Sequence, residues 1–383
     1  MCLSCQNAQR PTVRARSRSD LRWTPHDVSA LLLLGLAAIN LTCIMPRADV
    51  EVTQTKRPVW TTNLRDQGYT TSELVPPALY GSTRQLAFGS NEELLVAAGD
   101  LPTEGPEKPT KVQGFILDVG TGGVVGKANW MTRSRPYIFA TARGEYLADT
   151  ETGLTLYSSG LREVVAKSEY STRIASPDGR SVAVRTGEPG HGVTLFIDSE
   201  TLRKTDVEFV NKNVDSISHD RIAYIGWVNR SRNASVFVEN SRGEVARYDT
   251  QCHEVRPYFI SENTLAVVGC DQVEVFDAGG PRLFLHATRG DSSFVGASRD
   301  GSRFCIVEAF YGWGHDPGLR SERFTVFDVR SGTAVFTTSI KELGGRKSGR
   351  SGAALSPDGS YLAVNSLGVV RLFSLPAADR GAS

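Results

Sequence analysis

The chain has 383 residues, of which 40% are hydrophobic and 22% are charged, a balance typical of globular proteins that bury a substantial core. Lys and Arg number 43 against 42 Asp and Glu, and because residues 1–47 hold six arginines and two acidic residues, the remainder carries 37 basic and 40 acidic side chains. A nearly neutral body argues against nucleic-acid binding through a broad basic face. Six cysteines in a chain of this length also exclude a disulfide-stapled scaffold.

The N-terminal end carries the signals of an exported or tethered protein. Residues 1–27 form a polar, arginine-rich tail, and residues 28–45 form a stretch of 18 residues without a charge. At about 1.5 Å per residue this stretch spans about 27 Å as a helix, just enough for the hydrocarbon core of a bilayer. Arginines before it favour a cytoplasmic N-terminus, with the rest exported to a periplasmic or extracellular location.

Several interpretations of residues 28–45 remain open. They form a signal peptide cleaved near Ala48, an uncleaved membrane anchor, or a lipoprotein signal at Cys43, although Asn40 and Thr42 depart from that last motif. A buried core helix is a further alternative, but the chain offers no partner helices for it. The lone CxxC in the polar tail has no second pair, so we expect no metal site and no cofactor.

Residues 46–79 have the composition of a linker, with one candidate strand at residues 57–63. From about residue 80 the chain becomes a series of short apolar strands separated by turn signals, and no stretch keeps a 3.6-residue apolar period. The sequence therefore predicts an all-β domain over residues 80–376 with almost no helix, followed by a short C-terminal tail, residues 377–383.

One strand type recurs along this domain, as an apolar run that ends in a polar residue. The terminal polar residues are Asp118, Ser158, Asp198, Asn240, Asp277, Asp328 and Ser374. The intervals between them are 40, 40, 42, 37, 51 and 46 residues. A period of about 40–45 residues with four strands per unit is typical of a β-propeller blade. Seven copies predict a seven-bladed β-propeller of four-stranded antiparallel blades.

The turns support this repeat. Ser-Pro-Asp-Gly stands at residues 176–179 and 356–359, with a degraded copy, Ser-Arg-Asp-Gly, at 298–301. Pro presets φ for such a turn, Asp bonds the following amides, and Gly tolerates positive φ. The last unit ends soon after Ser374 and lacks an outer strand, so we expect residues 57–63 to supply it and close the ring.

These hairpins and this period resemble the WD-repeat-like and TolB-like β-propellers, over roughly residues 80–376. The resemblance implies the fold and no particular activity. The chain lacks the Trp-Asp and Gly-His dipeptides of true WD repeats and the repeated Trp-docking motif of quinone-cofactor propellers.

Insertions gather on one predicted face of the propeller, where the connections between blades also lie. They are Gly99–Lys111, Thr186–Gly192, Gly226–Ser235 and Glu308–Arg323. Loops on a rigid scaffold are where binding residues concentrate. The candidate residues for binding a partner are Trp227, Tyr311, Trp313, His315, Asp316 and His191. The alternative is that these aromatic residues only pack on neighbouring blades.

Two cysteines fall at the same end of one predicted hairpin. Cys252 precedes an inner strand and Cys270 ends the strand after it. An exported chain allows them to form a disulfide, and two free thiols are the alternative.

No nucleophile elbow, HExxH motif, Walker A loop or EF-hand is present. The first hypothesis is therefore a monomeric, exported or membrane-tethered propeller, without a catalytic residue, that binds a protein or peptide on its loop-rich face. The second is a propeller enzyme of lactonase or hydrolase type with a site in the central channel. Small inner-strand residues favour the binder; they are Ala140, Thr141, Ala175, Ser176, Ser218, Ser261, Ala297 and Ala354.

Overall fold

The computed structural model describes residues 57–69, 86–99, 109–133, 137–172, 174–187, 192–227, 233–250, 252–312, 319–341 and 351–377. The chain divides into two units, Met1–Glu51 and Val52–Ser383, and all described residues lie in the second. The expectations for residues 1–45, including Cys43, and for residues 378–383 fall outside the described residues. No helix in the described ranges is long and apolar enough to cross a membrane.

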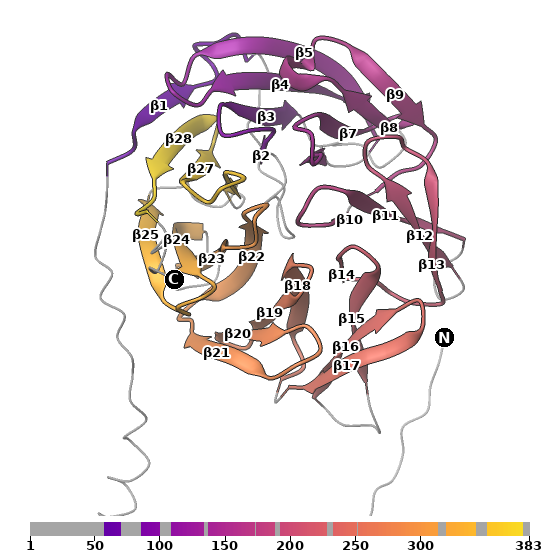
Figure 1. Cartoon of the computed structure of the whole chain (residues 1–383). Coiled ribbons are helices and arrows are strands. Elements are labelled where there is room, and N and C mark those ends of the chain that lie inside the picture. The colour runs from indigo at the N-terminus through magenta and orange to yellow at the C-terminus, as the bar shows by residue number, and fades with distance from the viewer. Residues whose placement is uncertain are drawn as a thin grey trace, which may run out of the picture. The chain divides into compact units, whose positions relative to one another are not determined.

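Seven four-stranded antiparallel sheets form a ring of blades around a central channel (Figure 1). The prediction of a seven-bladed propeller is confirmed, and one short 3₁₀ turn, Ser159–Leu161, is the helical element of the described ranges.

Blade one is β2 (Leu86–Phe88), β3 (Glu93–Gly99), β4 (Thr110–Asp118) and β5 (Val124–Thr132). Blade two is β6 (Ile138–Ala140), β7 (Tyr146–Thr150), β8 (Gly153–Tyr157) and β9 (Val164–Ser168).

Each of the next blades is likewise built from four consecutive strands, named from the channel outward. Blade three is β10 (Ile174–Ala175), β11 (Ser181–Thr186), β12 (Val193–Asp198) and β13 (Lys204–Val210), and blade four is β14 (Ser216–Ile217), β15 (Arg221–Trp227), β16 (Ala234–Asn240) and β17 (Gly243–Asp249). Blade five is β18 (Val255–Ser261), β19 (Thr264–Gly269), β20 (Gln272–Asp277) and β21 (Arg282–Ala287), and blade six is β22 (Asp291–Ala297), β23 (Arg303–Tyr311), β24 (Leu319–Asp328) and β25 (Ala334–Lys341).

Blade seven joins the two ends of the described chain. Its three inner strands are β26 (Gly352–Leu355), β27 (Tyr361–Ser366) and β28 (Val369–Ser374), and its outer strand is β1 (Trp60–Asn63), which pairs antiparallel with β28. This strand lies within residues 57–63, where the sequence predicts a ring-closing strand. The Trp60 indole also donates to the Val119 carbonyl of blade one, at 2.7 Å. Strand β1 therefore covers the free edge of β28 and ties blade seven to blade one.

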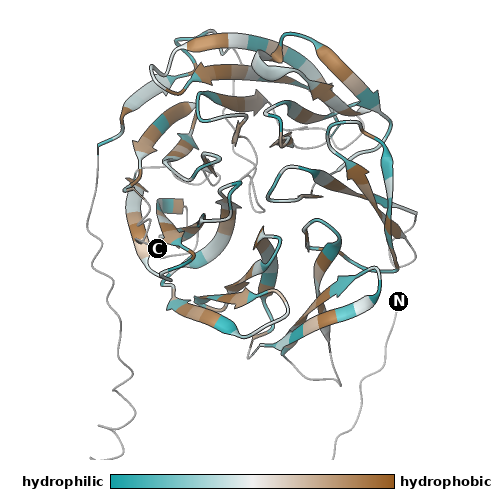
Figure 2. Ribbon diagram, viewed as in Figure 1, coloured by the Kyte–Doolittle hydropathy of each residue, from teal (hydrophilic) through white to brown (hydrophobic). Residues whose placement is uncertain are grey.

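The core lies between neighbouring blades, because the middle strands are apolar on both faces. Phe336 of blade six packs on Phe373 of blade seven, with ring centroids 5.6 Å apart. Phe304 and Phe294 of blade six likewise meet blade five, where Tyr258 stacks on Phe294 with centroids 4.6 Å apart. Figure 2 shows the hydrophobic residues along the strands and hydrophilic residues at many of the turns. Each blade therefore depends on its two neighbours for burial.

The three related turns share one hydrogen-bond pattern. The hydroxyls of Ser176, Ser298 and Ser356 each donate to the Asp two residues later, at 2.5 to 2.8 Å. Each of these hydroxyls also accepts the backbone N–H five residues later, at 2.9 or 3.0 Å. The Gly of each turn has φ between 68° and 73°, a region that favours Gly over residues with a Cβ. The degraded copy, which has Arg299 in place of Pro, keeps this geometry.

Candidate functional site

The central channel is the cavity that the fold itself creates. It has a volume of about 1560 Å³ and is lined by residues of all seven inner strands. One lining residue from each blade in turn is Leu86, Ile138, Ile174, Ser216, Tyr258, Phe294 and Leu355. A ligand in this cavity would therefore contact side chains that lie far apart in the sequence.

The two ends of the channel differ because the strands of each blade alternate in direction. One end, here called the connector face, carries the blade-to-blade connections and the turns between second and third strands. The other end, here called the hairpin face, carries the turns between first and second and between third and fourth strands, including the three Ser-x-Asp-Gly turns.

Arg299 crosses the channel at the hairpin face. Its guanidinium donates to the Ala142 carbonyl of blade two at 3.1 Å and to the Gly89 carbonyl of blade one at 3.3 Å, although Arg299 itself belongs to blade six. Burial lowers the pKa of this guanidinium from its ordinary value, and hydrogen bonds to carbonyl oxygens offset part of that desolvation. The side chain bridges three blades and narrows this end of the channel.

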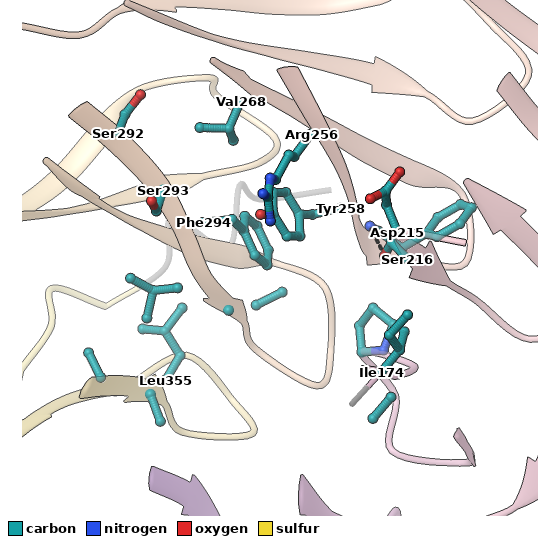
Figure 3. Close-up of a pocket in the computed structure, with 18 of the residues that line it drawn as sticks. Ile174, Asp215, Ser216, Arg256, Tyr258, Val268, Ser292, Ser293, Phe294 and Leu355 are labelled. Atoms are coloured by element: carbon teal, nitrogen blue, oxygen red, sulfur yellow. Dashed lines mark hydrogen bonds between the residues drawn. The ribbon is translucent and has the colours of Figure 1, made fainter. Parts of the chain in front are cut away.

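The opposite mouth has a polar and aromatic wall on the side of blades four to six (Figure 3). Asp215 and Ser216 stand beside Arg256 and Tyr258, and Phe294 stacks on Tyr258 with an interplanar angle of 9°. Arg256 and Tyr258 point to the same side because they are two residues apart on β18. The Ser216 hydroxyl accepts the Phe259 N–H at 2.9 Å and so anchors β18 to β14.

Asp215 is half-buried in this wall. Its Oδ2 accepts the Ile225 N–H at 3.1 Å. Burial raises the pKa of the carboxyl group above its ordinary value, and the Ile225 hydrogen bond and the Arg256 charge oppose that rise. The wall therefore combines a carboxylate, a guanidinium and two stacked rings, which are groups that bind a charged, partly apolar ligand.

The expected lining of small residues is only partly right. Ala140, Ala175, Ser176, Ala297 and Ala354 do line the cavity. Thr141, Ser218 and Ser261 are absent from the described lining, whereas Asp215, Arg256 and Arg299 belong to it. Ser218 follows the short strand β14 and is buried, so its side chain packs in the turn.

Two of the four predicted insertions include more strand than expected. The segment Glu308–Arg323 holds the ends of β23 and β24, which pair from Arg303↔Asp328 to Tyr311↔Leu319. Trp227 likewise ends β15 and pairs with Ala234. These two insertions begin and end within strands, because the buried residues Glu308, Ala309 and Glu322 belong to β23 and β24. The insertion Thr186–Gly192 lies between β11 and β12, as predicted.

Of the six predicted binding residues, Tyr311 is the one whose side chain is described, and it is 44% exposed at the end of β23. Trp227 is placed in β15 by its backbone. Trp313, His315, Asp316 and His191 lie outside the described residues. Asp215, Arg256 and Arg299 line the channel and were not predicted. The sequence held only weak signals for them. Asp215 is a polar residue just before an inner strand, Arg256 is an exposed position in the alternation of β18, and Arg299 replaces the Pro of the turn pattern.

Cys252 and Cys270 are joined by a disulfide in the structure, with Cα atoms 6.1 Å apart and a sequence separation of 18. Cys252 is buried, whereas Cys270 is exposed and lines the channel mouth. The bond links the connection before blade five to the turn between β19 and β20. Cys305, in contrast, is buried and free, and burial raises the pKa of its thiol well above the ordinary value.

Replacing both Cys252 and Cys270 by Ser is expected to lower the free energy of unfolding by up to about 3 kcal/mol, the loop-closure value for a loop of this length. The measurement is the midpoint of urea unfolding, with alkylation and mass spectrometry of the unfolded wild type to count protected thiols. Two protected cysteines in the peptides that contain these residues are expected. Full alkylation of both in the unreduced protein would contradict the bond.

The described residues contain no group of three or more His, Cys, Asp or Glu side chains placed to hold a metal ion. Glu308 instead forms a bidentate ion pair with Arg323, at 2.6 and 2.7 Å, and accepts the Arg289 N–H at 2.8 Å. Glu308 is 1% exposed. This pair lies between β23 and β24, and it fixes the connection that enters blade six.

Comparisons with known proteins find solved structures of similar fold. No protein-family model and no curated protein matches the chain. TolB from Acinetobacter baumannii is 13% identical, covering 73% of this chain and 80% of its own, with a TM-score of 0.35. BamB from Moraxella catarrhalis is 12% identical, covering 73% and 85%, with a TM-score of 0.35. Hsv2 from Kluyveromyces lactis is 12% identical, covering 72% and 92%, with a TM-score of 0.44. By the topology of its own sheets, this chain is a seven-bladed β-propeller.

Proposed function

We propose that this propeller is a binding module that takes a protein or peptide segment at the connector-face mouth of its central channel. The observation that carries the proposal is the cavity of about 1560 Å³ with walls from all seven blades. Pockets for small ligands typically have volumes of about 300–1,000 Å³. A larger, open-ended cavity on a rigid ring suits an inserted loop or chain segment better than a small molecule.

The chemistry of the wall supports the same proposal. Tyr258 and Phe294 supply a stacked aromatic surface, and Asp215 and Arg256 supply opposite charges beside it. Aromatic and arginine side chains contribute most of the binding energy in many protein interfaces. Arg299 narrows the hairpin face, so the connector face is the proposed entrance.

Export or membrane tethering is part of the proposal and rests on the hydrophobic residues 28–45. The Cys252–Cys270 disulfide supports it, because structural disulfides persist mainly in oxidising compartments. We propose that the propeller acts in the periplasm or outside the cell.

The test is affinity capture with the full-length chain in mild detergent, compared with two variants. One carries Arg256→Glu and Tyr258→Ala at the channel wall, and the other carries Tyr311→Ala, Trp313→Ala and His315→Ala at the end of blade six. Captured proteins are quantified by mass spectrometry, and thermal unfolding verifies that each variant is folded. A partner that the wild type retains, and that the channel variant loses at least tenfold, is expected.

A matched control changes Leu283 and Leu285 to Ala on the outer strand β21, where both side chains are 50% exposed and far from the channel lining. This control is expected to capture the same partner as the wild type. Loss of the partner only from the blade-six variant would move the binding site away from the channel. Equal capture by all variants would contradict the proposal.

A further inference from the structure

We infer that the segment bound in the channel inserts a basic side chain, Lys or Arg, next to Asp215 on the wall formed by blades four to six. The inference rests on the proposed function and adds the chemistry of the partner to it. Its basis is the charge and shape of this one wall, which differs from the rest of the channel (Figure 3).

Asp215 has one carboxylate oxygen that accepts no hydrogen bond from the described part of the chain. Oδ2 accepts the Ile225 N–H at 3.1 Å, and within the described ranges no side chain donates to Oδ1. Arg256 lies near enough to influence this carboxylate, but the two do not form an ion pair within 4.0 Å in the described part of the chain. A half-buried carboxylate without a salt bridge gains most from a cation that arrives with a ligand.

The surroundings of Asp215 fit a basic side chain in shape as well as in charge. The Tyr258–Phe294 stack offers a flat apolar surface beside the carboxylate. Lys and Arg pack their aliphatic stems along such surfaces while the charged head reaches a polar partner. Ile174 and Leu355, on the neighbouring blades three and seven, flank this wall with apolar side chains (Figure 3). An extended segment with apolar residues on either side of one cation matches the carboxylate and its apolar flanks.

The sign of the charge favours a basic over an acidic ligand. The lining at the connector-face mouth holds four carboxylates, those of Asp215, Glu254, Asp271 and Asp291, against the two guanidinium groups of Arg133 and Arg256. Acidic groups thus outnumber basic ones where the ligand enters, and complementary charge directs both the orientation and the rate of association. An acidic segment bound to Arg256 is the alternative that the experiment distinguishes.

The experiment is selection from a phage-displayed library of random dodecapeptides on the immobilised full-length chain. Peptides with Lys or Arg beside apolar residues are expected to enrich at least tenfold over the input library. The wild type is compared with Asp215→Asn, which removes the charge at nearly constant shape. Asp206→Asn is the matched control, because it makes the same charge change on the exposed face of outer strand β13.

Fluorescence anisotropy then measures the dissociation constant of the most enriched peptide. Asp215→Asn is expected to weaken binding at least tenfold, and Asp206→Asn to change it less than twofold. Replacing the basic residue of the peptide by Gln is expected to weaken binding to the wild type by a similar factor, which tests the contact without altering the protein. Raising the salt concentration is expected to weaken the wild-type complex more than the Asp215→Asn complex.

The outcomes separate the inference from the proposed function. Enrichment of acidic or neutral peptides at the channel would overturn the basic-ligand inference and leave the binding module in place. Enrichment of basic peptides that bind Asp215→Asn as tightly as the wild type would also overturn the inference. Failure of any peptide to enrich would contradict both.

Discussion

Glu308→Ala is expected to lower the free energy of unfolding by roughly 3 kcal/mol, because it leaves the guanidinium of Arg323 and the Arg289 N–H without their acceptor. Removing one partner of a buried ion pair typically costs about 3–5 kcal/mol. We expect a loss at the lower end of this range because the Arg323 side chain is 32% exposed. The measurement is the midpoint of urea or thermal unfolding followed by circular dichroism.

An exposed ion pair of the same chain provides the matched control. Lys204 and Glu208 approach to 2.8 Å on an outer strand, with side chains 46% and 48% exposed. Glu208→Ala is expected to leave the midpoint of unfolding unchanged within error, because an exposed ion pair contributes little. Adding Arg323→Met to Glu308→Ala is expected to restore part of the loss, since no unpaired charge then remains. A loss below about 1 kcal/mol for Glu308→Ala would contradict the role assigned to the buried pair.

Replacing Pro58–Asn63 by a Gly-Ser segment of equal length is expected to lower the unfolding temperature by about 10 °C. The change removes the half-buried Trp60 and its bond to the Val119 carbonyl, and the Thr62 hydroxyl bond to the Gly122 carbonyl, both at 2.7 Å. Lost burial, two lost hydrogen bonds and added chain entropy together come to roughly 4 kcal/mol. Each kcal/mol of lost stability lowers the unfolding temperature by about 2–4 °C.

The same variant is expected to associate with itself, because β28 becomes an uncovered sheet edge once β1 no longer pairs with it. Size-exclusion chromatography with light scattering measures this. Thr61→Ser is the control, since Thr61 is exposed and the backbone pairing with Arg371 is unchanged. A surface change typically shifts the unfolding temperature by no more than about 2 °C. If the variant unfolds within that range of the wild type and elutes as a monomer, β1 is dispensable for ring closure.

The fold was predictable because each blade repeats local chemistry. The apolar run predicted to end at Asp198 is the strand Val193–Asp198 in the structure, since the run ends there at a tight turn. The inner strands carry no such end signal, and the inner strand of blade three is only Ile174–Ala175. Inner strands are short and half-exposed to the channel, so neither length nor hydrophobicity marks their ends.

The candidate site was mostly not predictable. Sequence patterns pointed to aromatic residues in presumed loops, such as Tyr311, and the structure places that residue at the end of a strand. Asp215, Arg256 and Arg299 stand 41 and 43 residues apart, one in each of three blades. Nothing within a blade marks such positions as members of one site.

The sequence by itself determined the blades and their turns, because their hydrogen bonds join groups within five residues, as between Ser176, Asp178 and Ser181. The tertiary structure decided which residues face the channel, which end Arg299 narrows, and that β1 completes the blade of β28. Those contacts depend on the curvature of a closed ring, which arises only when all seven blades pack together. Local propensity cannot specify them, since they join residues of different blades.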